Sequence, residues 1–93
     1  MNIEKVEGAK KADIMLYALS TCGWCKKAKE YLNSLGVAYR YVFVDLLPEP
    51  DKNKAVAEIT KWNPSCSFPT IVVDNKRCII GFKPEELKEI AGK

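Results

Sequence analysis

The spacing of apolar positions changes several times along this 93-residue chain, and each change predicts a new structural element. Residues 14–19 form an unbroken apolar run, which is typical of a strand covered on both faces. From Cys25 to Leu35 the apolar positions recur every three or four residues, as on one face of a helix, and Gly36 ends the pattern. Residues 38–44 return to β-forming side chains. The order strand, helix, strand predicts a βαβ unit with parallel strands.

The second half of the chain predicts a helix, a hairpin and a closing helix. Apolar positions that follow two prolines place a helix at about 51–62. Two short apolar runs, 70–73 and 77–80, are separated by three polar residues, the pattern of an antiparallel hairpin. Pro84 suits the first position of a last helix. The order βαβαββα predicts an α/β domain in which a four-stranded mixed sheet carries helices on both faces.

Composition and charge narrow the range of functions and locations to expect of this chain. Residues 1–12 carry five charges and, after Met1, only Ile3 and Val6 as larger apolar residues, so we expect a loose arm, able to add an edge strand, before a domain of residues 13–93. Fifteen basic and twelve acidic residues are interspersed and leave a net charge of +3, so nucleic acid is not an expected partner. No apolar run approaches the roughly 20 residues of a membrane helix, and the N-terminus lacks the apolar centre of a signal peptide. We expect a cytoplasmic protein without a membrane partner.

The chemistry is concentrated in the segment Cys22-Gly23-Trp24-Cys25, a Cys-x-x-Cys at the change from strand to helix. Unpaired N–H groups of a first helical turn favour an ionised sulfur at this place, and either Ser20 or Thr21 can cap the helix. We expect Cys22, at or just before the first helical residue, to be the nucleophile. Cys25, shielded by the next turn, is the expected resolving thiol, and Trp24 is expected to project outward.

Zinc is the alternative interpretation of the cysteine pair. A structural zinc site takes four ligands, and the chain has no histidine. Cys66 and Cys78 could complete a four-thiolate set, but the twelve positions between them depart from the usual second pair. A Cys-x-x-Cys beside a βαβ pattern indicates redox chemistry first, so we expect no metal and no cofactor. Cys78 lies in an apolar run and is expected to pack in the core.

The segment Phe68-Pro69-Thr70 opens the first strand of the predicted hairpin. A proline is tolerated sterically at the first residue of a strand, which explains Pro69 without any function. The functional alternative is a cis proline beside the cysteine pair, whose neighbouring backbone binds an extended peptide or a thiol substrate. Cys66 lies three residues before Pro69. Most isolated cysteines are inert, and the alternative hypothesis is that Cys66 is an extra redox or regulatory thiol.

Together these motifs resemble the glutaredoxin and thioredoxin superfamily, and the chain is similar to a glutaredoxin over nearly all of residues 13–92. The matching segments are 16–25, 68–70 and 81–86. The resemblance implies a thioredoxin-like three-layer fold and a thiol–disulfide oxidoreductase that uses Cys22 and Cys25. It also implies that substrate is bound by residues around the pair, namely Trp24, Phe68, Pro69, Thr70, Gly81 and Phe82.

The resemblance extends to a subfamily. The segment Gly81-Phe82-Lys83-Pro84 is similar to that of the glutaredoxin-like donors of ribonucleotide reductase, whereas glutathione-using glutaredoxins have a second glycine and an acidic residue there. Those proteins also tend to have a basic residue where this chain has Leu19. Both departures imply a weakened glutathione site. The buried acid of thioredoxins would fall on Leu16, so the proton of Cys25 must leave by another route.

The implied protein is a monomer that reduces protein or low-molecular-weight disulfides. An NAD(P)H-dependent reductase or a small-thiol reductant would recharge it. A protein that binds an iron–sulfur cluster through Cys22, with or without Cys25, remains the alternative from a different class, although the cluster-carrying glutaredoxins use glutathione to bridge two subunits.

Overall fold

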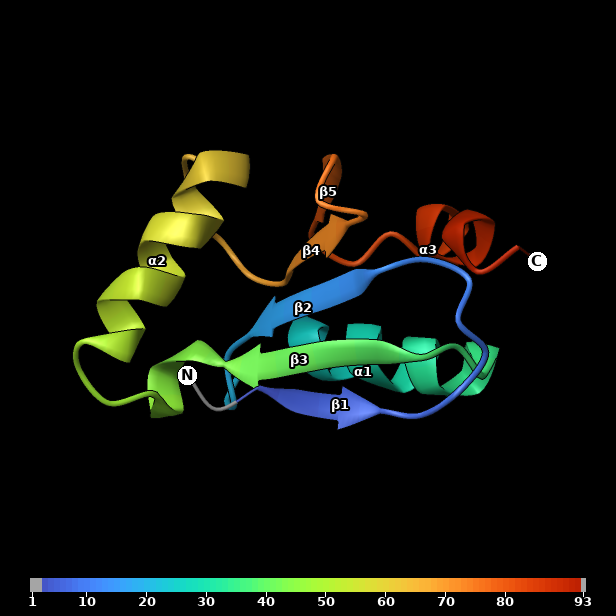
Figure 1. Cartoon of the computed structure of the whole chain (residues 1–93), viewed down its shortest axis with the longest axis horizontal. Helices are drawn as coiled ribbons and strands as arrows, with labels where there is room; N and C mark the ends of the chain where they lie inside the picture. Colours follow the sequence, from blue (N-terminus) through green and yellow to red (C-terminus); the bar gives the residue numbers. More distant parts are fainter. Residues whose placement is uncertain (1–2, 93) are drawn as a thin grey trace.

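The computed structural model describes residues 3–92 and consists of a mixed sheet between two layers of helices (Figure 1). The strands lie in the order β1-β3-β2-β4-β5. β2 and β3 are parallel, and every other neighbouring pair is antiparallel. The βαβ unit and the three-layer α/β fold are therefore confirmed. The strands are β1 (Glu4–Val6), β2 (Ile14–Ala18), β3 (Tyr39–Phe43), β4 (Thr70–Val73) and β5 (Arg77–Ile80).

The sheet has five strands, so the expectation of four was wrong. The difference is β1, which the charged arm contributes by pairing antiparallel with β3. Ala9 then bridges to Val37, and its N–H donates a hydrogen bond to the Gly36 carbonyl at 2.8 Å. These contacts join backbone groups, which every residue carries, so a segment with few apolar side chains can still extend a sheet. The described part of the arm is fixed at the sheet edge, while Met1, Asn2 and Lys93 lie outside the described residues.

The helices cover the two faces of the sheet unequally (Figure 1). α1 (Gly23–Leu35) and α3 (Pro84–Ile90) pack on one face, and α2 (Asp51–Trp62) packs on the other. Gly36 follows α1 with φ 70°, the left-handed conformation predicted for that glycine. A 3-10 helix, η1 (Val44–Leu46), follows β3 and was not expected, because three residues are too short for a periodic pattern. Across residues 3–92, none of the helices has the length and apolar character needed to cross a membrane.

Two hydrophobic cores lie on the opposite faces of the sheet. All five residues of β2 are buried, as predicted, because both faces of this strand are covered. Leu16 packs with residues of α1 and α3, whereas Met15 and Tyr17 pack with residues of α2, since alternate side chains of a strand point to opposite faces. The same alternation corrects the expectation for Cys78. It is half-buried, and its Sγ donates to the Trp62 carbonyl at 3.3 Å, while Ile79 fills the core.

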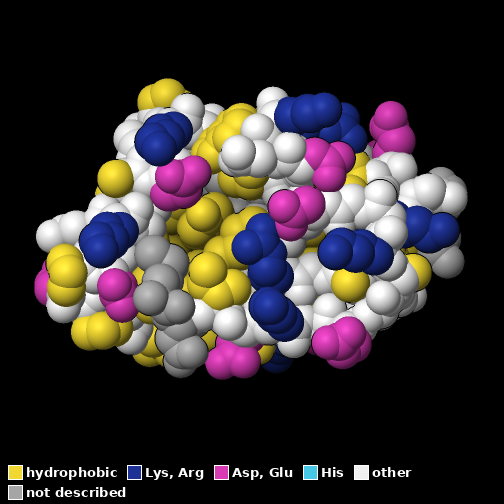
Figure 2. Space-filling model, viewed as in Figure 1, with side chains coloured by type: hydrophobic (Ala, Val, Ile, Leu, Met, Phe, Trp, Pro, Cys, Tyr) yellow, Lys and Arg dark blue, Asp and Glu magenta, His cyan; other side chains and the backbone are white. Residues whose placement is uncertain are grey.

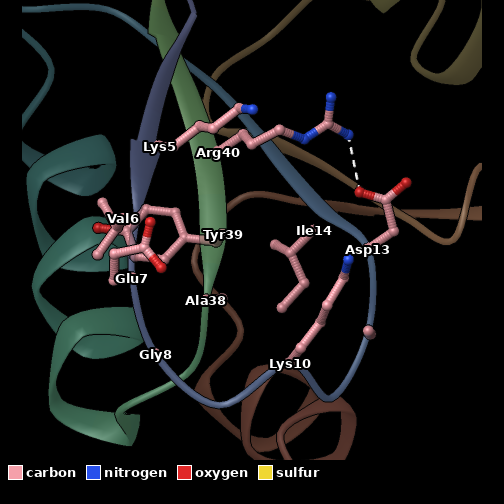
Figure 3. Close-up of a pocket in the computed structure, with 11 residues that line it drawn as sticks. Lys5, Val6, Glu7, Gly8, Lys10, Asp13, Ile14, Ala38, Tyr39 and Arg40 are labelled. Atoms are coloured by element: carbon pink, nitrogen blue, oxygen red, sulfur yellow. Dashed lines mark hydrogen bonds and ion pairs between the residues drawn. The ribbon is translucent and has the colours of Figure 1, made fainter.

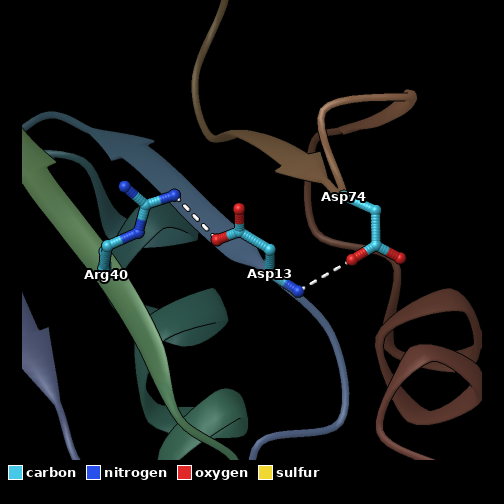
Figure 4. Close-up of polar contacts among 3 residues, drawn as sticks. All are labelled: Asp13, Arg40 and Asp74. Carbon is cyan, nitrogen blue, oxygen red and sulfur yellow. Dashed lines mark hydrogen bonds and ion pairs between the residues drawn. The ribbon is translucent and has the colours of Figure 1, made fainter.

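Polar contacts tie the start of β2 to its neighbours (Figure 4). The backbone N–H of Asp13 donates to Oδ1 of Asp74 at 2.9 Å, and Nη2 of Arg40 lies 2.8 Å from Oδ1 of Asp13. Both Asp13 and Arg40 are well exposed, so this ion pair contributes at most about 1 kcal/mol. Its effect is local: it links β2, β3 and the β4–β5 turn at the end of the sheet where β2 begins.

A hollow of about 290 Å³ lies beside these contacts, between the arm and the first residues of β2 and β3 (Figure 3). Lys5, Lys10 and Arg40 line it together with the acidic Glu7 and Asp13. Basic and acidic side chains are likewise mixed over the whole face seen in Figure 2. This hollow lies at the beginning of β2, so it is separated by the length of the strand from the cysteine pair, which follows the other end.

At Gly8 the arm lies against the backbone of Gly36 and Val37, which leads to a prediction. A Cβ at Gly8 would lie 2.6 Å from the Gly36 carbonyl oxygen and 2.7 Å from the carbonyl carbon of Val37. Gly8→Ala must displace one of these backbone segments, so we expect the free energy of unfolding, measured by urea denaturation, to fall by about 1–3 kcal/mol. Gly23→Ala is the matched control, because a Cβ there meets no atom within 4 Å. Equal losses in the two variants would contradict the steric explanation.

Candidate active site

Cys22 lies at the N-cap position of α1, immediately before the first helical residue, as predicted. Its backbone is extended (φ −92°, ψ 118°), and the N–H of Cys25 donates to its Sγ at 3.2 Å. The sulfur of Cys22 therefore has the capping role that we had expected of Ser20 or Thr21. Ser20 lies two positions and Thr21 one position before the N-cap, too early in the chain to meet the free N–H groups of the first turn. The cap places the half-buried sulfur against the positive end of the helix.

Cys25 is buried, with 1% of its surface exposed. Removal from water is the largest cause that raises the pKa of Cys25 to about 12, and the hydrogen bond between its thiol and Cys22 acts in the same direction. The charges of Cys22 and Asp45 raise this pKa further, and a hydrogen bond from the Leu19 backbone lowers it in part. Cys25 therefore keeps its proton at neutral pH. The predicted roles depended on an accessible Cys22 and a shielded Cys25, and the structure has both.

Trp24 and Phe82 form an apolar surface next to the pair. The Trp24 side chain is 60% exposed and projects outward, as predicted. Its ring stacks on Phe82 with centroids 6.1 Å apart and planes at 28°, and Phe82 meets Tyr31 edge-on at 5.9 Å. Nζ of Lys27 lies 5.6 Å from the centroid of the Trp24 ring. The fold thus brings together two predicted binding residues that lie 58 positions apart in the sequence.

The Phe68–Pro69 peptide bond is cis, as the functional alternative for Pro69 predicted. The N–H of Gly81 donates to the Pro69 carbonyl at 2.8 Å, so these two predicted binding residues are in direct contact. Gly81 has φ 84°, a left-handed conformation that explains why glycine suits this position. Phe68 is half-buried and packs, as Cys22 and Phe82 do, against the core beneath α1 and α3. Cys22, Phe68 and Phe82 therefore share one core.

A buried amide holds the proline segment in place. Nδ2 of Asn63, whose side chain is 2% exposed, donates to Oγ1 of Thr70 at 3.1 Å and to the Ser67 carbonyl at 3.3 Å. Oγ1 of Thr70 donates to the same carbonyl at 2.8 Å. Thr70 is fully buried, so its side chain supports the loop and does not reach a substrate. Sequence reasoning missed Asn63, because nothing in the sequence separates a buried loop asparagine from an exposed one.

Cys66 lies apart from the cysteine pair. It is half-buried and packs against the core under α2, on the face of the sheet opposite to the core that Cys22 and Cys25 join. Its backbone is left-handed, with φ 50°. The hypothesis that Cys66 is an extra redox thiol stays a prediction. Over residues 3–92, no three Cys, His, Asp or Glu side chains are grouped as metal ligands, so the four-thiolate zinc set considered above does not assemble.

A hollow of about 420 Å³ opens directly beside the two sulfurs, on the side of β3. It is lined by residues of the turn before Cys22, the first turns of α1 and the end of β3, among them Leu19, Ser20, Cys22, Cys25, Lys26 and Phe43. Its walls are apolar at Leu19 and Phe43 and basic at Lys26. The sulfur of Cys22 can therefore be approached both from this hollow and from the aromatic surface of Trp24 and Phe82.

Asp45 is a second residue that sequence reasoning did not single out. Both oxygens of its carboxylate accept hydrogen bonds from Ser20, Oδ1 from the backbone N–H at 2.9 Å and Oδ2 from the hydroxyl at 2.5 Å. These bonds hold the pKa of Asp45 below its ordinary value of 3.8, and Lys52 adds to the effect. The carboxylate is therefore ionised throughout the neutral range.

Comparison with known proteins identifies a family and solved structures that this chain resembles. The sequence model of the Glutaredoxin family matches residues 14–78. A crystal structure of a glutaredoxin from Methanosarcina mazei Go1 is 42% identical, with a TM-score of 0.91 over 98% of this chain and 88% of that one. Methanosarcina acetivorans methanoredoxin is 45% identical, with a TM-score of 0.90 over 92% of this chain and 90% of that one.

A curated relative is similar over almost its full length. It is a glutaredoxin-like 8.6 kDa protein of the rubredoxin operon of Clostridium pasteurianum, 34% identical over 86% of this chain and 99% of the relative. The region matched by the family model, residues 14–78, contains both cysteines of the pair and the cis proline. The TM-scores extend the similarity to the whole sheet and its helices. The chain belongs to the glutaredoxin family.

Proposed function

We propose that the protein is a dithiol thiol–disulfide oxidoreductase in which Cys22 is the nucleophile and Cys25 the resolving thiol. The observation that carries the proposal is the asymmetry of the pair. The accessible sulfur of Cys22 at the N-cap of α1 accepts a hydrogen bond from the backbone N–H of Cys25, whose own thiol is buried and stays protonated at neutral pH. Membership of the glutaredoxin family supports thiol oxidoreductase activity for such a pair. A structural pair would need no such difference in exposure.

The reaction then has two exchange steps. The Cys22 thiolate attacks one sulfur of the substrate disulfide, so a Cys22–substrate disulfide forms and the other substrate sulfur leaves as a thiolate. Cys25 gives up its proton to solvent and attacks the Cys22 sulfur, which releases the second substrate thiolate. The substrate gains two electrons, and the protein is oxidised to a Cys22–Cys25 disulfide. The thiols Cys66 and Cys78 take no part.

Two surfaces support a protein disulfide as substrate. The exposed ring of Trp24, backed by Phe82, offers apolar contact area beside the reactive sulfur. Among residues 3–92, no hydrogen bond engages the backbone N–H or carbonyl of Phe68, so both groups are free to pair with an extended peptide. Thr70 supports the proline loop through the hydrogen bond from its hydroxyl to the Ser67 carbonyl. Gly81 holds Pro69 through the hydrogen bond from its N–H to the Pro69 carbonyl.

The remaining parts of the proposal concern the cellular setting. The segment Gly81-Phe82-Lys83-Pro84 supports a redoxin that delivers electrons to an enzyme such as ribonucleotide reductase. Leu19 offers no positive charge to bind glutathione. We place the reaction in the cytoplasm, where a reducing environment keeps thiols free. An NAD(P)H-dependent reductase or a small thiol would restore the reduced pair. The protein would act as a monomer.

Stoichiometric reduction tests the proposal. Fully reduced protein is mixed with insulin, or with hydroxyethyl disulfide as a small substrate, and the protein is analysed by mass spectrometry after proteolysis. We expect one disulfide reduced for each protein oxidised and a single new linkage between Cys22 and Cys25. No reduction, or a coloured iron-containing dimer after anaerobic purification, would refute the proposal. The same spectra test Cys66, which should carry a sulfenic acid or mixed disulfide after mild oxidation if it is a redox thiol.

A further inference from the structure

The parallel register of β2 and β3 brings one carboxylate to the turn that carries Cys22. Ala18, the last residue of β2, lies opposite Phe43, the last residue of β3. Two residues beyond each strand end, Ser20 therefore meets Asp45, which belongs to η1. Both oxygens of the Asp45 carboxylate are used by this one residue, through the Ser20 hydroxyl and backbone N–H.

These bonds fix the start of a short turn whose end carries the reactive sulfur. Ser20 precedes Cys22 by two residues, and the N–H of Cys22 donates to the Leu19 carbonyl at 3.3 Å, which closes the turn. Few other contacts restrain this turn, since Ser20 and Thr21 are exposed. The half-buried Asp45 thus connects the end of β3 to Ser20, two residues before the N-cap.

We propose, on the basis of the function proposed above, that Asp45 is a positioning residue: its carboxylate holds the turn that places Cys22 at the N-cap of α1. Asparagine tests whether hydrogen bonding is sufficient for this role, because it keeps two polar atoms facing Ser20 and removes the charge.

Dithiodipyridine, a neutral aromatic disulfide, separates the two exchange steps of the proposed reaction in a stopped-flow experiment. The attack of Cys22 releases one absorbing thiopyridone and leaves a mixed disulfide on Cys22. The attack of Cys25 then releases the second thiopyridone and forms the Cys22–Cys25 disulfide. Each phase is measured from pH 5 to pH 9 for the wild type, Asp45→Ala, Asp45→Asn and Ser20→Ala. Asp74→Asn is the charge control, because it makes the same change in the β4–β5 turn, at the opposite end of the sheet.

We expect Asp45→Ala to slow the first phase by about tenfold, within the range of up to about a hundredfold that displacement of a reacting group by 1 Å can cost. Asp45→Asn should restore the first phase to within about twofold of the wild type. Recovery in Asp45→Asn would show that the hydrogen bonds to Ser20, and not the charge of the carboxylate, hold the turn. Asp74→Asn should behave as the wild type in both phases.

Two results would overturn the inference: a first phase in Asp45→Ala equal to that of the wild type, or a first phase in Asp45→Asn as slow as that of Asp45→Ala. If Asp45→Ala does not fold, as circular dichroism would report, Ser20→Ala tests the same contact, since it deletes only the hydroxyl bond and should slow the first phase by a few fold. Failure of the wild type to release a second thiopyridone would instead refute the proposed dithiol function, so the two failures are distinguishable.

Discussion

Replacing Cys22 by serine is expected to abolish disulfide reduction, whereas replacing Cys25 by serine should leave the protein able to start the reaction and unable to finish it. A serine hydroxyl is not ionised at neutral pH and does not exchange with disulfides. We therefore expect Cys22→Ser to reduce turnover of insulin by about a thousandfold or more, as removal of a nucleophile does in other enzymes. Turnover is measured with a chemical reductant such as dithiothreitol, which does not depend on the natural reductase.

The Cys25→Ser variant distinguishes the two roles. Without the buried thiol, the mixed disulfide on Cys22 has no internal partner, so the adduct should accumulate and appear in the intact mass. Cys66→Ser is the matched control, because Cys66 packs on the other face of the sheet and should not change turnover. An adduct that accumulates on Cys25 in the Cys22→Ser variant, with turnover retained, would reverse the assignment of nucleophile and resolving thiol.

Leu16→Ala is the substitution expected to cost most stability. Leu16 lies in the middle of β2, is fully buried, and packs with residues of α1 and α3 such as Leu32 and Leu87. Truncation of a buried leucine leaves a cavity that surrounding residues fill only in part, so we expect the free energy of unfolding to fall by about 2–5 kcal/mol. A domain of this size has a total of only about 5–15 kcal/mol, so the variant should be close to unfolding at 37 °C.

Urea denaturation of Leu16→Ala and Leu46→Ala compares the same chemical change in two environments. Leu46 lies in η1 and is 67% exposed, so its truncation removes little buried surface and should change the free energy of unfolding by less than about 0.5 kcal/mol. A loss in Leu46→Ala as large as that in Leu16→Ala would show that Leu46 is covered in solution. A loss below about 1 kcal/mol in Leu16→Ala would contradict the central position of β2 in the core.

Much of the fold was predictable because its elements have strong local signals. The unbroken apolar run of β2, the three-and-four spacing that Gly36 ends in α1, and Pro84 at the start of α3 each predict an element from neighbouring residues. The arm strand β1 was missed in the count because its pairing uses backbone groups, which carry no sequence signal. Cys78 was misplaced because burial in a short apolar run depends on which face of β5 each residue occupies.

The sequence by itself determined the cysteine pair, its place before a helix, and the proline that immediately precedes a strand, because these depend on residue identity and spacing over a few positions. Only the tertiary structure decided that Trp24 stacks on Phe82, that Asn63 supports Thr70, and that Asp45 reaches Ser20. Each of these contacts joins residues from separate elements. Such contacts arise from strand register and from packing across the sheet, which no local pattern of side chains specifies.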